Sequence, residues 1–245
     1  MEILILGNGG GINSGLRYNS FLVNETLLVE APPDIVPSIG HAQADINKIE
    51  SVYISHFHGD HCFGLPFLFL TLGNTGRDRP ITVFSPPGGQ EHILKLFVTA
   101  FSDTAPGYRF LSEQTNFIEV SDRTQAELVE GWTTEFVLTE HSKTTFGFFL
   151  SQNTTGGFFY IPDTLWTPRF FPFLERKPDF VLADMNGTGD EENPKHMSVK
   201  DIQENALPVT GNSTSYLATH LFEPMAMSVQ NILPVQPGMA FKLGG

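Results

Sequence analysis

The sequence predicts an α/β fold in which two mixed β-sheets pack face to face and helices cover their outer faces. Three observations predict this αββα sandwich. Short apolar segments typical of strands are followed by helical patterns, and this order then occurs a second time along the chain. No linker or low-complexity segment divides the 245 residues, so we expect a single domain over residues 1–245. An apolar fraction of 40% is sufficient for a large buried core.

The first half of the chain contains strand-like segments separated by turns, and then helical patterns. Strands are predicted over residues 2–7, 20–24, 26–31, 50–55 and 81–86. The first of them ends in a glycine-rich turn with the sequence GNGGGINSG. Helices are predicted over residues 64–73 and 88–101, the second because its apolar residues recur at helical spacing.

The second half repeats this arrangement. Strands are predicted over residues 134–141, 146–151, 156–163, 179–185 and 215–220. A helix is predicted over residues 198–207, because Ser198 is a suitable N-cap at its start. The loops 73–80, 104–110 and 185–195 are expected to supply substrate contacts, since loops on a rigid scaffold commonly carry specificity.

The charge of the chain argues against a long nucleic acid as its partner. The net charge is −13, and the 14 Lys and Arg residues form no cluster, so phosphate backbones would be repelled. A small-molecule substrate is therefore expected. The 22 Phe residues indicate an aromatic core, and the apolar segment after His61 suggests a possible homodimer.

The single cysteine, Cys62, excludes an internal disulfide and suits a reducing compartment. The chain starts with a strand-like segment that has no basic region and no cleavage signal. Its longest apolar run, around residues 63–73, is too short to span a bilayer. These features predict a soluble cytoplasmic protein with no membrane partner.

The stretch SHFHGDHCFG, residues 55–64, crowds four potential metal ligands into six positions. A tight loop presents alternate side chains, so His56 and His58 can share one ion while Asp60 and His61 point to a second. Imidazole together with carboxylate suits zinc, and suits iron(II) or manganese nearly as well. Four potential ligands at this density therefore predict a metal site.

Further candidate ligands follow strand-like segments elsewhere in the chain. His141, Asp163 and His220 each close such a segment, and His196 lies just before the predicted helix. Side chains at the rim of a sheet often form sites because the scaffold beneath them is rigid. Other roles remain open: Asp163 could cap a turn, His141 and His220 could pack at strand ends, and His196 could lie in a solvated loop.

The motif His56-x-His58-x-Asp60-His61 matches H-x-H-x-D-H, the signature of the metallo-β-lactamase superfamily, and the chain resembles its ribonuclease Z-like branch. Six further segments are similar to that branch and stand in its order: LGNGGGINSGLRYNSFLV, EHSKTTFGFFL, YIPDT, KHMS, LATH and PGMAFKL. The resemblance covers nearly the whole chain. It implies the metallo-β-lactamase fold.

The resemblance also implies two divalent metal ions, with zinc expected first and manganese or iron as alternatives. The implied ligands of the first ion are His56, His58 and His141. Those of the second ion are Asp60, His61 and His220. Asp163 would bridge both ions, and a hydroxide would sit between them. Asp60 and His196 are expected to act in catalysis, with His196 beside the metals as a possible acid.

The implied activity is that of a dinuclear-metal-dependent hydrolase, and within it a phosphodiesterase. The family's tRNA-grasping arm is inserted between the equivalents of His141 and Asp163, which here lie only 22 positions apart. This departure favours a small or cyclic phosphodiester over tRNA. Two alternatives stay open: a lactonase or thioesterase of the same fold, and a non-hydrolytic protein that binds a metal or ligand.

Two neighbouring features receive structural interpretations. Cys62 adjoins His61, but the family pattern has no ligand there, so an inert thiol at a helix start is expected. Gly9, Gly10 and Gly11 match neither the Walker pattern nor the dinucleotide-binding pattern of phosphate-binding loops. We expect them to allow a close approach of the backbone to the site.

Overall fold

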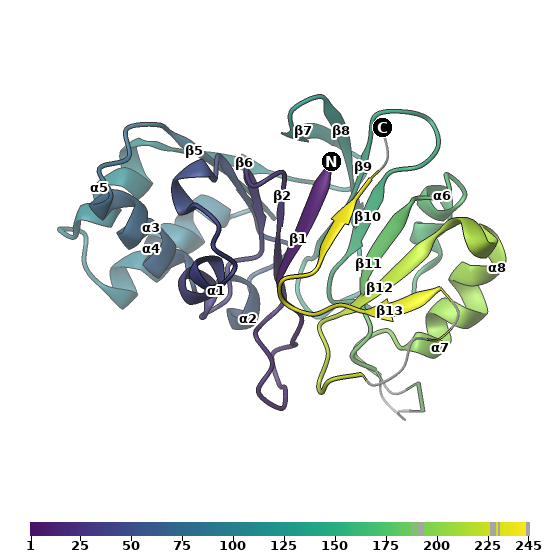
Figure 1. The fold of residues 1–245 in the computed structure, drawn as a ribbon. Helices are drawn as coiled ribbons and strands as arrows, with labels where there is room; N and C mark the ends of the chain where they lie inside the picture. Colours follow the sequence, from purple (N-terminus) through teal and green to yellow (C-terminus); the bar gives the residue numbers. More distant parts are fainter. Residues whose placement is uncertain (188, 191–193, 226–228, 230, 244–245) are drawn as a thin grey trace.

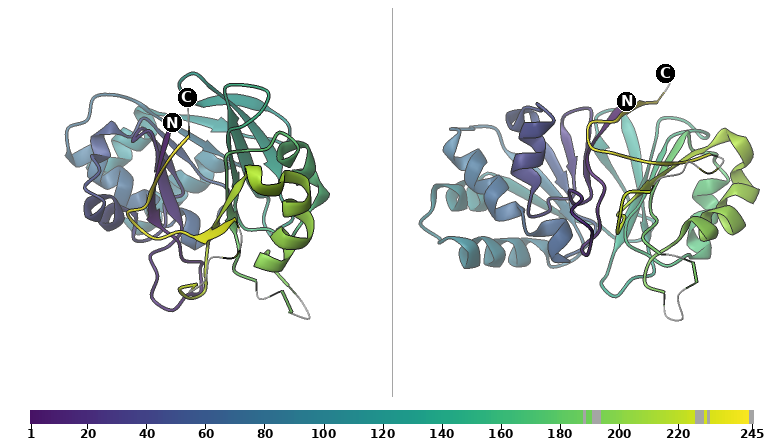
Figure 2. Two further views of the ribbon diagram at one scale, coloured as in Figure 1. Left: turned by 45° about the vertical axis from the view of Figure 1, so that its right-hand side comes forward. Right: turned by 60° about the horizontal axis from the view of Figure 1, so that its bottom comes forward.

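The two-sheet sandwich predicted from the sequence is confirmed by the structure, a computed structural model that describes residues 1–187, 189–190, 194–225, 229 and 231–243. Figure 1 shows two sheets facing each other in the middle of the molecule. The second panel of Figure 2 shows helices outside both sheets, which gives four layers. Residues 2–4 near the N-terminus pair with residues 240–242, close to the end of the described chain (Figure 1).

The first sheet has seven strands among the described residues, in the order β14-β1-β2-β3-β4-β5-β6. Pairing is antiparallel from β14 to β3 and parallel from β3 to β6. The strands are β1 Glu2–Gly7, β2 Ser20–Val23, β3 Leu27–Val29, β4 Ser51–Tyr53, β5 Ile81–Ser85, β6 Thr115–Glu119 and β14 Ala240–Lys242.

The second sheet mirrors this plan, with seven described strands in the order β13-β12-β11-β10-β9-β8-β7. Pairing is parallel from β13 to β10 and antiparallel from β10 to β7, so both sheets are mixed, as predicted. The strands are β7 Gln125–Val129, β8 Trp132–Leu138, β9 Phe146–Ser151, β10 Phe158–Ile161, β11 Phe180–Asp184, β12 Ser215–Thr219 and β13 Ile232–Pro234.

Helices cover the outer face of each sheet. Those on the first sheet are α1 Ile35–His41, α2 Gly59–Cys62, α3 Leu65–Asn74, α4 Gly89–Ala100 and α5 Pro106–Glu113. Those on the second are α6 Phe171–Leu174, α7 Val199–Asp201, a π-helical turn Ile202–Ala206 and α8 Leu207–Thr210. Short 3₁₀ turns lie at Ile46–Lys48, Pro168–Phe170 and Gly211–Ser213. The predicted cap at Ser198 is confirmed, because its side chain and that of Asp201 form a capping box.

The interior between the sheets is rich in aromatic side chains, as the composition predicts. The ring of Tyr53 stacks on Phe136 at 5.9 Å and meets the edge of Phe148 at 4.9 Å between ring centroids. Such offset and edge-to-face pairs add to the free energy gained by burying the rings. The exposed Phe63 and Phe67 leave an apolar surface after His61, and the homodimer suggested by that segment stays a prediction.

One loop prediction is wrong. Residues 104–110, expected to form a substrate loop, instead lead into helix α5, which packs against α3. Pro106 occupies the first turn of the helix, where its missing N–H is tolerated. A Cβ atom at Gly73 would come within 2.7 Å of the Gly107 Cα, so the two helices cross at their glycines. Part of the predicted loop 185–195 lies outside the described residues.

No helix in the described part of the chain is long and apolar enough to cross a membrane.

Candidate metal centre

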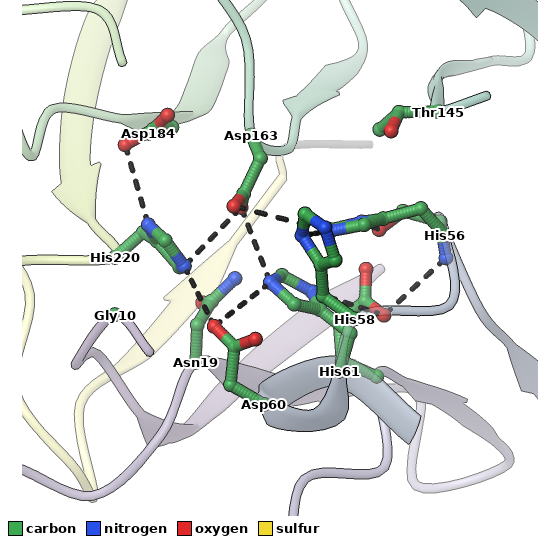
Figure 3. A network of polar contacts seen from close by, with 12 residues as sticks. Gly10, Asn19, His56, His58, Asp60, His61, Thr145, Asp163, Asp184 and His220 are labelled. Atoms are coloured by element: carbon green, nitrogen blue, oxygen red, sulfur yellow. Dashed lines mark hydrogen bonds and ion pairs between the residues drawn. The ribbon is translucent and has the colours of Figure 1, made fainter. Parts of the chain in front are cut away.

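The seven residues predicted as ligands come together at one edge of the sandwich, where several parallel strands end. Six of them, all except His141, are labelled in Figure 3. His56 follows β4, Asp163 follows β10 and His220 directly follows β12. Parallel strands end at a common edge, so side chains far apart in sequence are brought together there. Short helix α2 then presents Asp60 and His61 from the loop that follows β4.

The first group contains His56, His58, His141 and Asp163. His58 Nδ1 lies 2.9 Å from His56 Nε2 and 3.2 Å from His141 Nε2. The Oδ2 atom of Asp163 lies 3.9 Å from His56 Nε2 and 3.8 Å from His141 Nε2. Three ring nitrogens and one carboxylate oxygen therefore face a common point.

The second group contains Asp60, His61, His220 and the other oxygen of Asp163. His61 Nε2 and His220 Nε2 each lie 3.2 Å from Asp163 Oδ1. Asp60 Oδ2 lies 3.4 Å from His61 Nε2 and 3.2 Å from His220 Nε2. Asp163 thus directs one oxygen into each group, which is the arrangement required of a bridging ligand.

Both groups fit divalent metal ions. Ligand bonds of about 2.0–2.1 Å in a tetrahedral site place donor atoms roughly 3.3 Å apart, close to the separations observed here. His61 Nε2 and Asp163 Oδ1 are buried and lack a well-aligned hydrogen-bond partner among the described residues. A buried polar atom without a partner costs free energy of folding. A cation at each point would satisfy these atoms. The donor set of imidazole and carboxylate suits zinc, manganese or iron(II).

The protonation states of the carboxylates also favour cations. Burial by itself would raise the pKa of Asp163, but His220 and His61 lower it well below its usual range. The pKa of Asp60 is likewise lowered, because the neighbouring rings of His220 and His61 outweigh the effect of its burial. Burial lowers the pKa of His56, which keeps this ring neutral and able to donate its lone pair.

The glycine-rich turn approaches this centre closely, as expected. A Cβ atom at Gly11 would lie 2.8 Å from Asp60 Oδ2, and one at Gly10 would lie 2.9 Å from the backbone oxygen of His220. Side chains at these positions would therefore push into the carboxylate and histidine that face the second point. His220 itself has φ +59°, in the left-handed region, so its backbone conformation is held by its surroundings.

His196 lies beside the centre and is held by Asp184, a residue that the sequence analysis missed. Its Nδ1–H donates to Asp184 Oδ2 at 2.7 Å, and its ring lies 5.1 Å from that of His220 between centroids. The other oxygen of Asp184 lies 3.4 Å from His220 Nδ1 (Figure 3). One buried carboxylate therefore orients two histidines. Its signal in the sequence is the acidic residue that closes strand β11, the same signal that identified Asp163.

Glu30, also missed, forms a second buried support. Its side chain is fully buried, and its Oε2 lies 3.4 Å from His61 Nδ1. Its Oε1 accepts a hydrogen bond from Tyr160 at 3.0 Å, Tyr160 accepts one from Asn19, and Asn19 accepts one from Thr219. This chain of side chains runs beneath the centre and joins both sheets. A carboxylate on the distal nitrogen of a ligating histidine fixes its tautomer and orientation.

Replacing Glu30 with glutamine is expected to lower the affinity for metal about 10–100-fold, because His61 loses the acceptor that orients it. Titration calorimetry with zinc, in competition with a chelator, measures this affinity. Glu50→Gln, at an exposed position on the same sheet, serves as the matched control and should bind as the wild type does. Equal affinities in Glu30→Gln and the wild type would show that the contact with His61 has no positioning role.

Cys62 is completely buried, and its thiol donates to the backbone oxygen of His58 at 3.2 Å. Burial raises its pKa to about 12. Since the thiolate is the reactive form, well under about 1 in 1,000 molecules would carry it at pH 8. We expect iodoacetamide to leave the native protein unmodified over hours and to modify it at once in denaturant, as measured by intact mass. Fast modification of the native protein would contradict this burial.

By its fold and its sequence relatives, the chain is a ribonuclease Z-like member of the metallo-β-lactamase superfamily. The predicted superfamily and branch are thereby confirmed. Residues 1–225 match the model of the family described as anti-Pycsar protein Apyc1, and the chain belongs to that family.

Individual relatives support the same class. Ribonuclease Z of Methanosarcina mazei is 29% identical over 167 residues, which are 65% of this chain and 51% of that protein. The chain thus spans about half the length of this curated relative. The crystal structure of human tRNase Z, short form, superposes with a TM-score of 0.77 at 14% identity and covers 100% of both chains. Zinc-bound PqqB from Methylobacterium extorquens reaches 0.69 at 16% identity, covering 99% of this chain and 100% of its own.

Proposed function

We propose that this protein is a dinuclear-metal-dependent phosphodiesterase whose substrate is a small cyclic phosphodiester, namely a cyclic nucleotide. The observation that carries the proposal is the pair of ligand groups sharing Asp163, with the His196–Asp184 pair directly beside them. Membership of the anti-Pycsar protein Apyc1 family supports the cyclic nucleotide as the substrate. The likeness to ribonuclease Z supports the phosphodiester bond as the bond that is cleaved.

The proposed ligands of the first ion are His56, His58 and His141. Those of the second are Asp60, His61 and His220, and Asp163 is shared. Zinc is the proposed metal, with manganese or iron as alternatives. Two bound divalent cations supply a water of lowered pKa and neutralise the charge that develops on the phosphate.

In this proposal Asp60 holds the attacking water. Its side chain keeps 16% of its surface exposed, whereas that of Asp163 keeps only 3%. It is therefore the more solvent-accessible of the two carboxylates in the second group. Its lowered pKa keeps it ionised, so it accepts a hydrogen bond from the water and orients it toward the phosphorus.

In this proposal His196 protonates the leaving oxygen. Because its Nδ1–H is donated to Asp184, the Nε2 atom is the one that remains for the substrate. Burial alone would lower the pKa of His196, but the hydrogen bond and charge of Asp184 raise it above its usual value. A larger fraction of the ring is then protonated near neutral pH, as a general acid requires.

The structure between His141 and Asp163 supports a small substrate. These residues, all of them described, form the antiparallel strands β9 and β10 and their connection. No inserted arm extends from this segment. Without such an arm, this segment offers no surface for grasping a long RNA. The net charge of −13 also disfavours the binding of a long RNA.

Hydrolysis of 3′,5′-cyclic nucleotides by the purified protein with added zinc or manganese tests the proposal. The same panel includes bis(p-nitrophenyl) phosphate, lactones and thioesters, and it is run in parallel on His58→Ala. We expect phosphodiester turnover that His58→Ala abolishes. Turnover of a lactone or thioester but of no phosphodiester would favour the alternative hydrolase. Absence of any turnover, or activity that His58→Ala leaves unchanged, would contradict the proposed function.

A further inference from the structure

A pocket of about 250 Å³ opens beside the metal centre, between the turn that carries His141 and the segment that precedes His196. It is lined by Glu140, His141, Ser142, Leu165, Pro194 and Lys195. The rings of His141 and His196 lie 5.9 Å apart between centroids. The pocket therefore adjoins both a proposed metal ligand and the proposed acid, on the side where the leaving group departs.

Backbone hydrogen bonds fix the position of this pocket relative to the centre. The N–H of Glu140 donates to Thr164 Oγ1 at 3.0 Å, and the N–H of Leu165 donates to the backbone oxygen of Glu140 at 2.9 Å. These two segments also carry His141 and Asp163. Two walls of the pocket are thus bonded to each other and continuous with the proposed ligands, so a group bound there is held at a set distance from the reacting phosphate.

The walls suit an uncharged group that combines apolar surface with hydrogen-bonding atoms. Leu165 and Pro194 offer apolar surface, while Ser142 offers a hydroxyl that can donate or accept. Glu140 and Lys195 add one negative and one positive charge, so the pocket carries no net charge. The Glu140 carboxylate would accept hydrogen bonds from the N–H groups on the edge of a heterocyclic base.

The size of the pocket fits one part of a substrate. Pockets that enclose a whole ligand occupy about 300–1,000 Å³, so this pocket of about 250 Å³ is smaller than that range. Three larger clefts on the described surface, of about 350, 270 and 520 Å³, are lined by none of the seven proposed ligands. They therefore have no direct access to the chemistry.

We propose that this pocket binds the heterocyclic base of the cyclic nucleotide and that Leu165 and Glu140 determine substrate specificity. The proposal rests on the proposed function and names the subsite that separates a nucleotide from a simple phosphodiester. Binding of the base supplies affinity that an abasic cyclic phosphate lacks, and it aligns the 3′-oxygen with His196.

The test compares a 3′,5′-cyclic nucleotide with the 3′,5′-cyclic phosphate of 1-deoxyribose, which lacks a base. For the wild type, kcat/KM for the nucleotide should exceed that for the abasic compound about 100-fold, since a site built for a polar group rejects the analogue without it. Leu165→Trp fills the pocket and is expected to raise KM for the nucleotide about 10-fold or more. Its KM for the abasic compound should stay within about twofold of the wild-type value. Glu140→Gln, a change at an exposed side chain, should raise the nucleotide KM about threefold to tenfold.

Leu233→Trp is the matched control, because it places the same ring in the 350 Å³ cleft on β13. This variant should change the kinetics of hydrolysis of neither the nucleotide nor the abasic compound. Thermal melting and the activity on the abasic compound show whether each variant is folded, and Glu140→Gln keeps the test decisive should Leu165→Trp misfold.

The outcomes distinguish a failure of the base-binding pocket from a failure of the proposed phosphodiesterase activity. The base-binding role of the pocket would be overturned if the wild type had equal kcat/KM for both substrates. It would also be overturned if Glu140→Gln and folded Leu165→Trp left the nucleotide KM unchanged. Either result would leave the proposed phosphodiesterase activity standing. A wild type that hydrolyses no phosphodiester at all would overturn the proposed function, and the base subsite with it.

Discussion

Asp163→Asn is expected to lower phosphodiester hydrolysis about 1,000-fold or more. Metal-based charge stabilisation contributes several kcal/mol to such reactions, and each 1.36 kcal/mol is a factor of ten in rate. Asp163 directs one oxygen into each ligand group, so a single substitution weakens both. The amide also presents an N–H₂ group where a negatively charged oxygen stood, which opposes a cation at one of the two points.

Elemental analysis after dialysis measures the loss of metal directly. We expect two equivalents in the wild type and at most one in Asp163→Asn. Asp103→Asn makes the same chemical change at an exposed position and should retain both equivalents and full activity. Wild-type metal content and activity in Asp163→Asn would contradict the bridging role.

His196→Ala is expected to slow hydrolysis of a cyclic nucleotide about 100- to 10,000-fold, the range typical of a general acid. The leaving group of a cyclic nucleotide is an alkoxide, which needs a proton in order to depart. For bis(p-nitrophenyl) phosphate the leaving p-nitrophenolate is stable without one, so the same variant should lose little activity. This difference between substrates distinguishes an acid from a residue that merely supports the fold.

The pH dependence provides a second measurement for His196. A group whose pKa is raised stays protonated to higher pH, so the acid form is available below that pKa and is lost as the pH rises through it. We expect kcat for the cyclic nucleotide to fall on the alkaline side in the wild type, and this limb to be absent in His196→Ala. His41→Ala, at an exposed histidine of α1, should match the wild type throughout. Equal losses on both substrates would rule out the acid role.

The strands and the candidate ligands could be predicted largely from local sequence. His56, Asp163 and His220 each follow an apolar run, and that run determines both the strand and its end. A resemblance based on the same short segments then joins ligands from both halves of the chain. The structure brings together all seven residues, whose roles as ligands stay predictions until metal binding is measured.

The supports of the centre could not be predicted because they depend on tertiary contacts. Glu30 closes β3 in the middle of an apolar segment, and nothing in that segment shows that His61 and Tyr160 will meet it. Asp184 acquires its role only when β11 lies beside β12, which places it between His196 and His220. Helix α5 was missed because its first residues, Pro106 and Gly107, are typical of loops in the absence of α3.

The division of the proposed ligands between the two sheets has a consequence for folding. His56, His58, Asp60 and His61 follow a strand of the first sheet, whereas His141, Asp163 and His220 follow strands of the second. Neither sheet alone offers a complete donor set, so cations bind tightly only to the docked pair. By mass action such binding stabilises the native state, by about 4.1 kcal/mol when the free metal exceeds its dissociation constant 1,000-fold.

Chelation should therefore lower the melting temperature by several degrees, as followed by calorimetry at a series of free zinc concentrations. The shift should be largely absent in Asp163→Asn. The proposed ions would then stabilise the pairing of the two sheets in addition to serving the chemistry.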